Sequence, residues 1–239
     1  MGRYRTIIRF YLLTLIKWQT VSVAGVMAFN VLLSVVIPAL TSVPAGSTIG
    51  TSDIIALFWA LSIGIALGPY GFRFLLYHGV SRRTQFIADS LTLAVTSAMW
   101  ALIVTLVVSA NLWFARTSVV FQWLYHRQDI LSTVTWEFAA LLLFAFAGWL
   151  IYLVHHVTDW KGKLWIAVAP FVLGPTLALV NALSGGALFS GIRHAFLVAM
   201  GFGSSVPNPY VGAFGMLVFV LLLGAVVRSI LLRVQVKEL

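Results

Sequence analysis

The residues with the greatest chemical potential in this sequence are few, and the densest group is His155-His156 with Asp159. At this spacing the imidazole and carboxylate groups can share one face of a helix and hold a metal ion. The group also fits a solvated polar turn, because it ends an apolar run and precedes Lys161 and Lys163. The chain has no cysteine, which excludes disulfides, thiolate chemistry and cysteine metal sites. We therefore predict no metal site.

Three further charged or titratable residues border or interrupt apolar segments: Glu137, Arg193 and His194. An ionisable side chain in a membrane segment is a functional hypothesis by default. Glu137 opens an apolar run at what we take to be its outer edge, where a negative charge also complements the helix dipole. These three residues are candidates for a transport or gating role, and a purely structural role is the alternative.

Enzymatic motifs are weak. The stretch 184-SGGALFSG-191 is faintly similar to an intramembrane serine protease, but such an enzyme needs a histidine base on a facing helix, and His194 follows too closely. There is no GxxxxGK[ST] loop, so this chain alone is not expected to hydrolyse nucleotide. No acidic residue lies near the middle of an apolar run, since Asp89 is near the inner end of its run. An ion-driven transporter is therefore disfavoured.

The composition defines the environment that positions these residues. The chain is 61% hydrophobic and 9% charged, with a mean hydropathy of +1.02, whereas soluble domains carry about 25% charged residues. So much apolar surface cannot be hidden from water in 239 residues. We predict an all-α integral membrane protein with one transmembrane domain over residues 1–239.

Six apolar stretches approach or reach the roughly 20 residues that span a bilayer: 19–40, 54–76, 87–110, 138–154, 164–183 and 211–229. Residues 1–18 form a basic amphipathic pattern typical of an interfacial helix. The segment 184–210 is apolar in its middle, but Arg193 would cost about 2.5 to 3.5 kcal/mol at the bilayer centre. We therefore expect a re-entrant outer segment between spans five and six.

The basic residues are distributed asymmetrically around these six spans. Twelve of the 15 lie on the side of the two termini, and the other three are Arg116, Arg127 and Arg193. Cytoplasmic loops carry such an excess of lysine and arginine, so we expect both termini in the cytoplasm and the chain in the cell membrane. The net charge of +9 is thereby explained by topology, and no nucleic acid partner is predicted.

The stretch 71-GFRFLLYHGVSRRTQFIADS-90 crowds cations between two apolar runs. Within it, Gly79, Val80, Ser81, Arg82, Arg83 and Phe86 form a pattern of glycine, apolar residue, serine, arginine, basic residue and phenylalanine. Together with the layout above, this pattern resembles the permease subunit of bacterial ATP-binding-cassette (ABC) exporters of the type-2 class. The resemblance covers nearly the whole chain in layout, whereas the local motif is short.

The resemblance implies a permease that moves a substrate outward with ATP hydrolysed by a separate ATPase subunit. ATP and Mg²⁺ would bind that subunit, and this chain would bind no cofactor. A second permease protomer and membrane lipid are the other implied partners. The loop would carry a coupling helix that docks on the ATPase through Arg73, His78, Gly79, Val80, Ser81, Arg82 and Arg83. Lys161 and Lys163 would make a second cytoplasmic contact.

Other functions stay open at this point. The chain also fits a membrane-embedded enzyme or a regulatory membrane subunit, and a channel is disfavoured because no selectivity-filter sequence is present.

Three structural expectations follow from local patterns. Ser81 is placed to cap the helix of the third span. The loop after that span is rich in aromatic residues, which suggests interfacial anchoring: Trp113, Phe114, Phe121, Trp123 and Tyr125. Gly64 and Pro69 make the second span deformable, with static packing as the alternative.

Overall fold

The computed structural model describes residues 25, 51–77, 80–114, 120–126, 129–163, 175–176, 179–185, 187–203 and 206–233. Every regular element in these ranges is helical, which confirms the all-helical prediction. The helices are α2 (Thr51–Tyr77), α3 (Arg82–Phe114), α4 (Val120–Tyr125), α5 (Ile130–Val157), α7 (Ala187–Ala199) and α8 (Pro209–Arg233).

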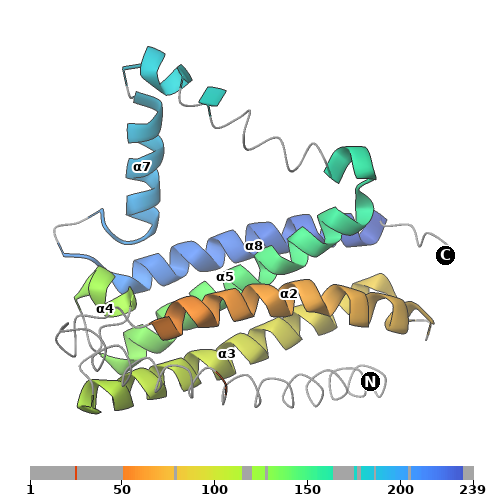
Figure 1. Ribbon diagram of the computed structural model, residues 1–239, viewed down its shortest axis with the longest axis horizontal. Helices are drawn as coiled ribbons and strands as arrows, with labels where there is room; N and C mark the ends of the chain where they lie inside the picture. Colours follow the sequence, from red (N-terminus) through yellow and green to blue (C-terminus); the bar gives the residue numbers. More distant parts are fainter. Residues whose placement is uncertain are drawn as a thin grey trace, which may run out of the picture.

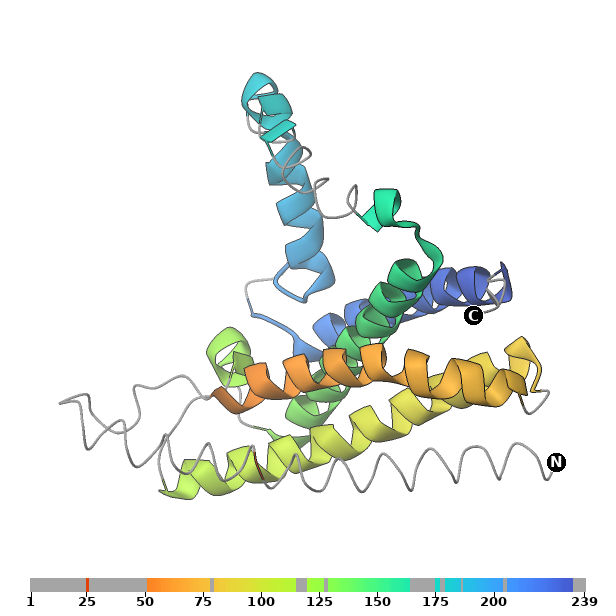
Figure 2. The same ribbon diagram turned by 45° about the vertical axis from the view of Figure 1, so that its right-hand side comes forward.

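Four long helices, α2, α3, α5 and α8, lie side by side as a bundle (Figure 1). Helices α2, α5 and α8 begin at one end of the bundle, beside α4, while α3 begins at the other. We call these the α4 end and the turn end, the latter after the turn between α2 and α3. Helix α7 projects from the bundle and meets it only near the start of α8 (Figure 2).

Three of the described helical stretches are long and apolar enough to cross a membrane: Arg82–Leu106, Ile130–Val157 and Pro209–Arg233. They cover most of the predicted third span and contain the fourth and sixth. Helix α2 contains the predicted second span, with a shorter apolar stretch, Ile54–Leu67. Residues 1–18, the first span at 19–40 except Gly25, and most of 164–183 lie outside the described residues, so the count of six stays a prediction.

Helix α7 has 13 residues, and its length of about 20 Å is shorter than the roughly 30 Å hydrocarbon core. This length supports the expectation that 184–210 does not span. Its re-entrant placement stays a prediction.

Helix α5 is the centre of the bundle, since it contacts α2, α3 and α8. Trp149 on α5 is almost fully buried, and its ring stacks on Phe86 of α3 with centroids 5.7 Å apart. The Phe146 ring lies 5.8 Å from the same indole. Of the 28 residues of α5, 13 are buried inside the bundle, whereas apolar residues such as Leu131 and Ile151 are exposed.

The closest helix pair is α2 with α5, and two glycines make it possible. A Cβ atom on Gly64 would overlap the carbonyl oxygen of Ala145, and one on Gly148 would overlap that of Leu61. Small residues let the backbones of membrane helices approach in this way. Gly64 therefore has a packing role, and α2 continues as one helix through Pro69.

Candidate functional site

The turn between α2 and α3 holds the predicted docking residues. The Thr84 backbone N–H donates to the Ser81 hydroxyl over 3.2 Å, which confirms Ser81 as the N-cap of α3. Val80 is half-buried against the core, so it anchors the turn from inside. His78 and Gly79 lie outside the described residues, as does the side chain of Arg73.

The two arginines after the cap have different surroundings. Arg82 is half-buried, and its Nη1 donates to the carbonyl oxygen of Leu232 over 2.9 Å. This bond joins the first residue of α3 to the last turn of α8. Arg83 is exposed. Arg82 therefore holds two helices together, and Arg83 is the arginine that a partner can reach.

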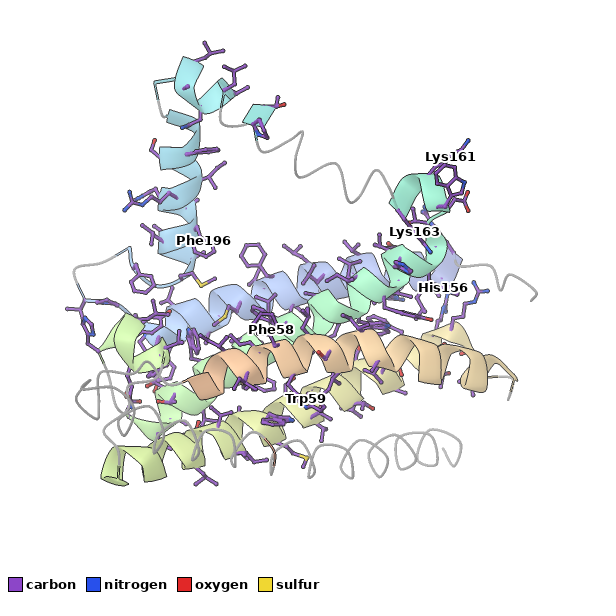
Figure 3. All side chains as sticks on the ribbon, in the orientation of Figure 1. Phe58, Trp59, His156, Lys161, Lys163 and Phe196 are labelled. Carbon is purple, nitrogen blue, oxygen red and sulfur yellow. The ribbon has the colours of Figure 1, made fainter. Side chains whose placement is uncertain are left out.

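Other cations gather at the same end of the bundle. Lys161 and Lys163 are exposed just beyond the end of α5 (Figure 3), in a short turn where the Lys163 N–H donates to the Asp159 carbonyl over 2.9 Å. Arg228 and Arg233 are exposed near the end of α8. A surface of this charge attracts acidic protein groups or anionic lipid.

The histidines at the end of α5 do not form a metal centre with their neighbours. Among the residues that the structure describes, no three histidine, aspartate or glutamate side chains are grouped closely enough to hold a metal ion. The ring of His156 stacks on Tyr152, with centroids 5.7 Å apart.

The prediction that Glu137 opens its helix was wrong. Helix α5 begins at Ile130, where the Asp129 carboxylate accepts a hydrogen bond from the Ser132 N–H over 3.0 Å. Glu137 is therefore two turns inside the helix, and only 1% of its surface is exposed. Arg193 and His194 are exposed on the projecting α7. The three predicted gating residues are thus not brought together.

The interpretation of the outer aromatic residues as interfacial anchors was wrong for the two that can be described. Phe121 and Tyr125 of α4 are buried, and their rings pack together with Trp136 of α5 and Phe202 from the segment before α8. The Tyr125 hydroxyl donates to the Met200 carbonyl over 2.7 Å. Burial raises the pKa of this hydroxyl above its usual value, so it stays a donor at neutral pH.

Replacing Tyr125 with phenylalanine is expected to lower the free energy of unfolding by about 1 to 3 kcal/mol, because the Met200 carbonyl loses its partner while the ring stays packed. Urea or SDS titration of the purified chain measures the change. Tyr210→Phe is the matched control, since that side chain is exposed. Equal stability of Tyr125→Phe and the original chain would show that this bond does not hold α4.

One candidate site was missed from the sequence. Helix α3 buries Gln85, Asp89, Thr92 and Thr96 on one face, at spacings of four, three and four residues. This is the spacing of one helical face. The signal was present, because these polar residues interrupt an otherwise apolar span.

A scan of protein-family models and searches of curated proteins and of solved structures give no match to this chain. The layout of the helices and the residues described above are therefore the observations that bear on function.

Proposed function

We propose that this chain is the membrane-spanning permease subunit of an ABC exporter, with both termini in the cytoplasm of a cell membrane. A separate ATPase subunit would bind at the turn end of the bundle and hydrolyse ATP with Mg²⁺. Two permease protomers would pair to form the transporter. The chain itself would bind no nucleotide and catalyse no reaction.

The observation that carries the proposal is the α2–α3 turn. Ser81 caps α3, Arg82 ties the start of α3 to α8, and Arg83 remains exposed at the tip of this braced structure. A turn of this kind is rigid enough to pass a force from a partner into three helices at once. The cations around it favour a partner with an acidic docking groove.

Movement at this turn would reach the rest of the bundle through α2. Because α2 and α5 are in backbone contact at Gly64 and Gly148, a displacement of α2 also displaces α5. ATP-driven closure of two ATPase subunits below a pair of protomers would therefore move the central helix, as transport requires.

The test begins with the neighbouring genes: one that encodes a GxxxxGK[ST] loop supplies the ABC ATPase subunit to co-purify with this chain, and the absence of such a gene counts against the proposal. We expect Arg83→Glu to weaken the complex at least about tenfold, because it places a negative charge against an acidic groove. Arg83 is preferred over Arg82, whose substitution also breaks the bond to Leu232. Binding is measured by titration of the ATPase onto nanodiscs that hold the chain.

Arg193→Glu is the matched control for complex formation, since Arg193 is exposed on α7, away from the turn end. An equal loss with Arg193→Glu would mean that net charge alone governs binding. If the ATPase binds the Arg83→Glu variant with the same affinity as the original chain, the docking assignment is wrong. Cleavage of a peptide or lipid by the purified chain alone would instead establish the membrane-embedded enzyme.

A further inference from the structure

Helix α3 buries a row of polar side chains, which we call the polar face, among apolar ones over the apolar stretch Arg82–Leu106. Five side chains on it are at most 4% exposed, namely Gln85, Asp89, Thr92, Thr96 and Ser97, and Thr105 is a sixth buried polar side chain farther along the helix. This face is turned toward the other helices of the bundle, whereas Ile87, Leu91 and Leu102 on the opposite side are exposed. Placing a polar face inward is unfavourable unless each of its groups is hydrogen-bonded.

Only some of these groups are hydrogen-bonded. Thr92 and Thr96 donate to carbonyl oxygens of their own helix, and the Gln85 side chain forms a hydrogen bond with that of Asp89. The second carboxylate oxygen of Asp89, the amide oxygen of Gln85 and the hydroxyl of Thr105 have no hydrogen-bond partner. Buried polar atoms are nearly always satisfied, so these oxygens point to a donor or a cation that enters.

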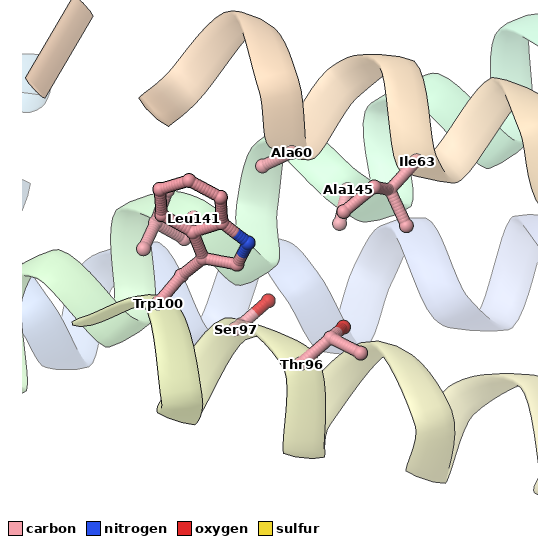
Figure 4. Close-up of a pocket in the computed structure, with 7 residues that line it drawn as sticks. All are labelled: Ala60, Ile63, Thr96, Ser97, Trp100, Leu141 and Ala145. Carbon is pink, nitrogen blue, oxygen red and sulfur yellow. The ribbon is translucent and has the colours of Figure 1, made fainter. Parts of the chain in front are cut away.

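A small cavity touches the same face (Figure 4). It lies between α2, α3 and α5, where Thr96, Ser97 and Trp100 of α3 face Ala60 and Ile63 of α2 and Leu141 and Ala145 of α5. The cavity is about two turns of α3 beyond Asp89. The close packing of the three helices is therefore interrupted beside the polar face.

The ionisable side chain buried on this face is acidic. Among the described residues the buried ionisable side chains are Asp89 on α3 and Glu137 on α5, although the whole sequence carries a net charge of +9. A carboxylate in a low-dielectric interior lowers the cost of bringing a cation there and raises that of an anion.

We propose that the polar face of α3 lines a path for positively charged solutes through the bundle, with Asp89 as the residue that binds the cationic group. This inference rests on the proposed transport function and adds a substrate class to it. The unsatisfied oxygens of Gln85 and Asp89 would receive the cation at the turn end. The hydroxyls of Thr96 and Ser97 would contact it farther along α3.

The absence of cysteine allows a direct test with single cysteine variants in liposomes. Ser97→Cys replaces a buried hydroxyl on the cavity with a thiol of similar size. Methanethiosulfonate reagents transfer an alkylthio group to the thiolate and release methanesulfinate. The cationic trimethylammonium-ethyl reagent and the anionic sulfonatoethyl reagent are compared, and the rate of modification is read by mass spectrometry.

We expect Ser97→Cys to react at least about tenfold faster with the cationic reagent than with the anionic one. Adding Asp89→Asn should remove most of this preference, because Asp89 lies about 12 Å from position 97 along the helix, where one charge changes a rate about tenfold. Leu102→Cys, on the exposed apolar face, should react slowly with both reagents. Thr96→Cys repeats the test at a neighbouring position.

Two results would overturn the path. The first is that Thr96→Cys and Ser97→Cys react with the cationic reagent no faster than Leu102→Cys does. The second is that the preference for the cationic over the anionic reagent persists after Asp89→Asn. The labelling is measured on the chain alone and with the ATPase. If the chain binds the ATPase but shows no preference for the cationic reagent, the proposed path is wrong and the docking proposal stands. If the chain shows this preference but binds no ATPase, the docking proposal is wrong and the path stands.

Discussion

Replacing Gly64 with valine is expected to separate α2 from α5 and lower the free energy of unfolding by at least about 3 kcal/mol. The new Cβ would overlap the Ala145 carbonyl oxygen and lie 2.8 Å from the Trp149 backbone nitrogen. Both are backbone atoms of a helix, so no side-chain rotation relieves the overlap. The two helices must move apart along their contact, and SDS titration of the chain in mixed micelles measures the cost.

Ala66→Val is the matched control for this prediction. Ala66 lies two residues farther along α2 and is exposed, so the same β-branched side chain adds no contact inside the bundle. We expect its effect to stay within about 0.5 kcal/mol. If the two valine variants unfold at the same SDS fraction, the close approach of α2 and α5 does not stabilise the bundle.

This contact also bears on the proposed mechanism. A hinge at Gly64 would let α2 bend independently of α5, but the α5 backbone packs directly against this glycine. In the proposed mechanism, a force delivered at the α2–α3 turn would therefore move α2 and α5 together. The α3 face that borders them would then change its packing, and this is the face on which one oxygen each of Gln85 and Asp89 lacks a hydrogen-bond partner.

Local signals predicted the parts of the fold that local physics controls. The apolar runs predicted α3, α5 and α8, because length and hydropathy alone define a helix that crosses a membrane. Ser81 was predicted as a cap, because its hydroxyl needs only an N–H three residues later. Asp129 is an equally local signal for the start of α5, whereas the apolar run that begins at 138 predicts a later start and places Glu137 at the helix edge.

Local patterns of this kind do not predict contacts between segments that are far apart in the sequence. Tyr125 in a loop with several aromatic residues fits a membrane interface as well as a core, and only its bond to Met200 distinguishes them. The different roles of Arg82 and Arg83 depend on Leu232, 150 residues away. Likewise, a glycine in a membrane helix signals either a bend or a close contact, and the facing carbonyl of Ala145 decides between them.

Truncating Trp149 to alanine is expected to lower the free energy of unfolding by as much as Gly64→Val does, or by more. The side chain is 1% exposed and packs between Phe86 of α3 and Phe146 of its own helix. Its removal leaves a cavity lined by rings that cannot collapse into it, at a cost of about 3 to 5 kcal/mol. In a membrane this cost is mainly lost van der Waals contact, because lipid is as apolar as the core. Thermal unfolding in nanodiscs, followed by the fluorescence of the remaining tryptophans, measures it.

Trp160→Ala separates this packing effect from the loss of a tryptophan as such. Trp160 lies just beyond the end of the same helix and is 71% exposed, so its removal creates no cavity and should shift the stability by about 0.5 kcal/mol or less. Trp149→Phe should recover part of the loss, since a ring remains to stack on Phe86. If Trp149→Ala were no less stable than Trp160→Ala, α3 and α5 would not be held by this stack. The Arg82 bond to Leu232 would then be the stronger tie of α3 to the bundle.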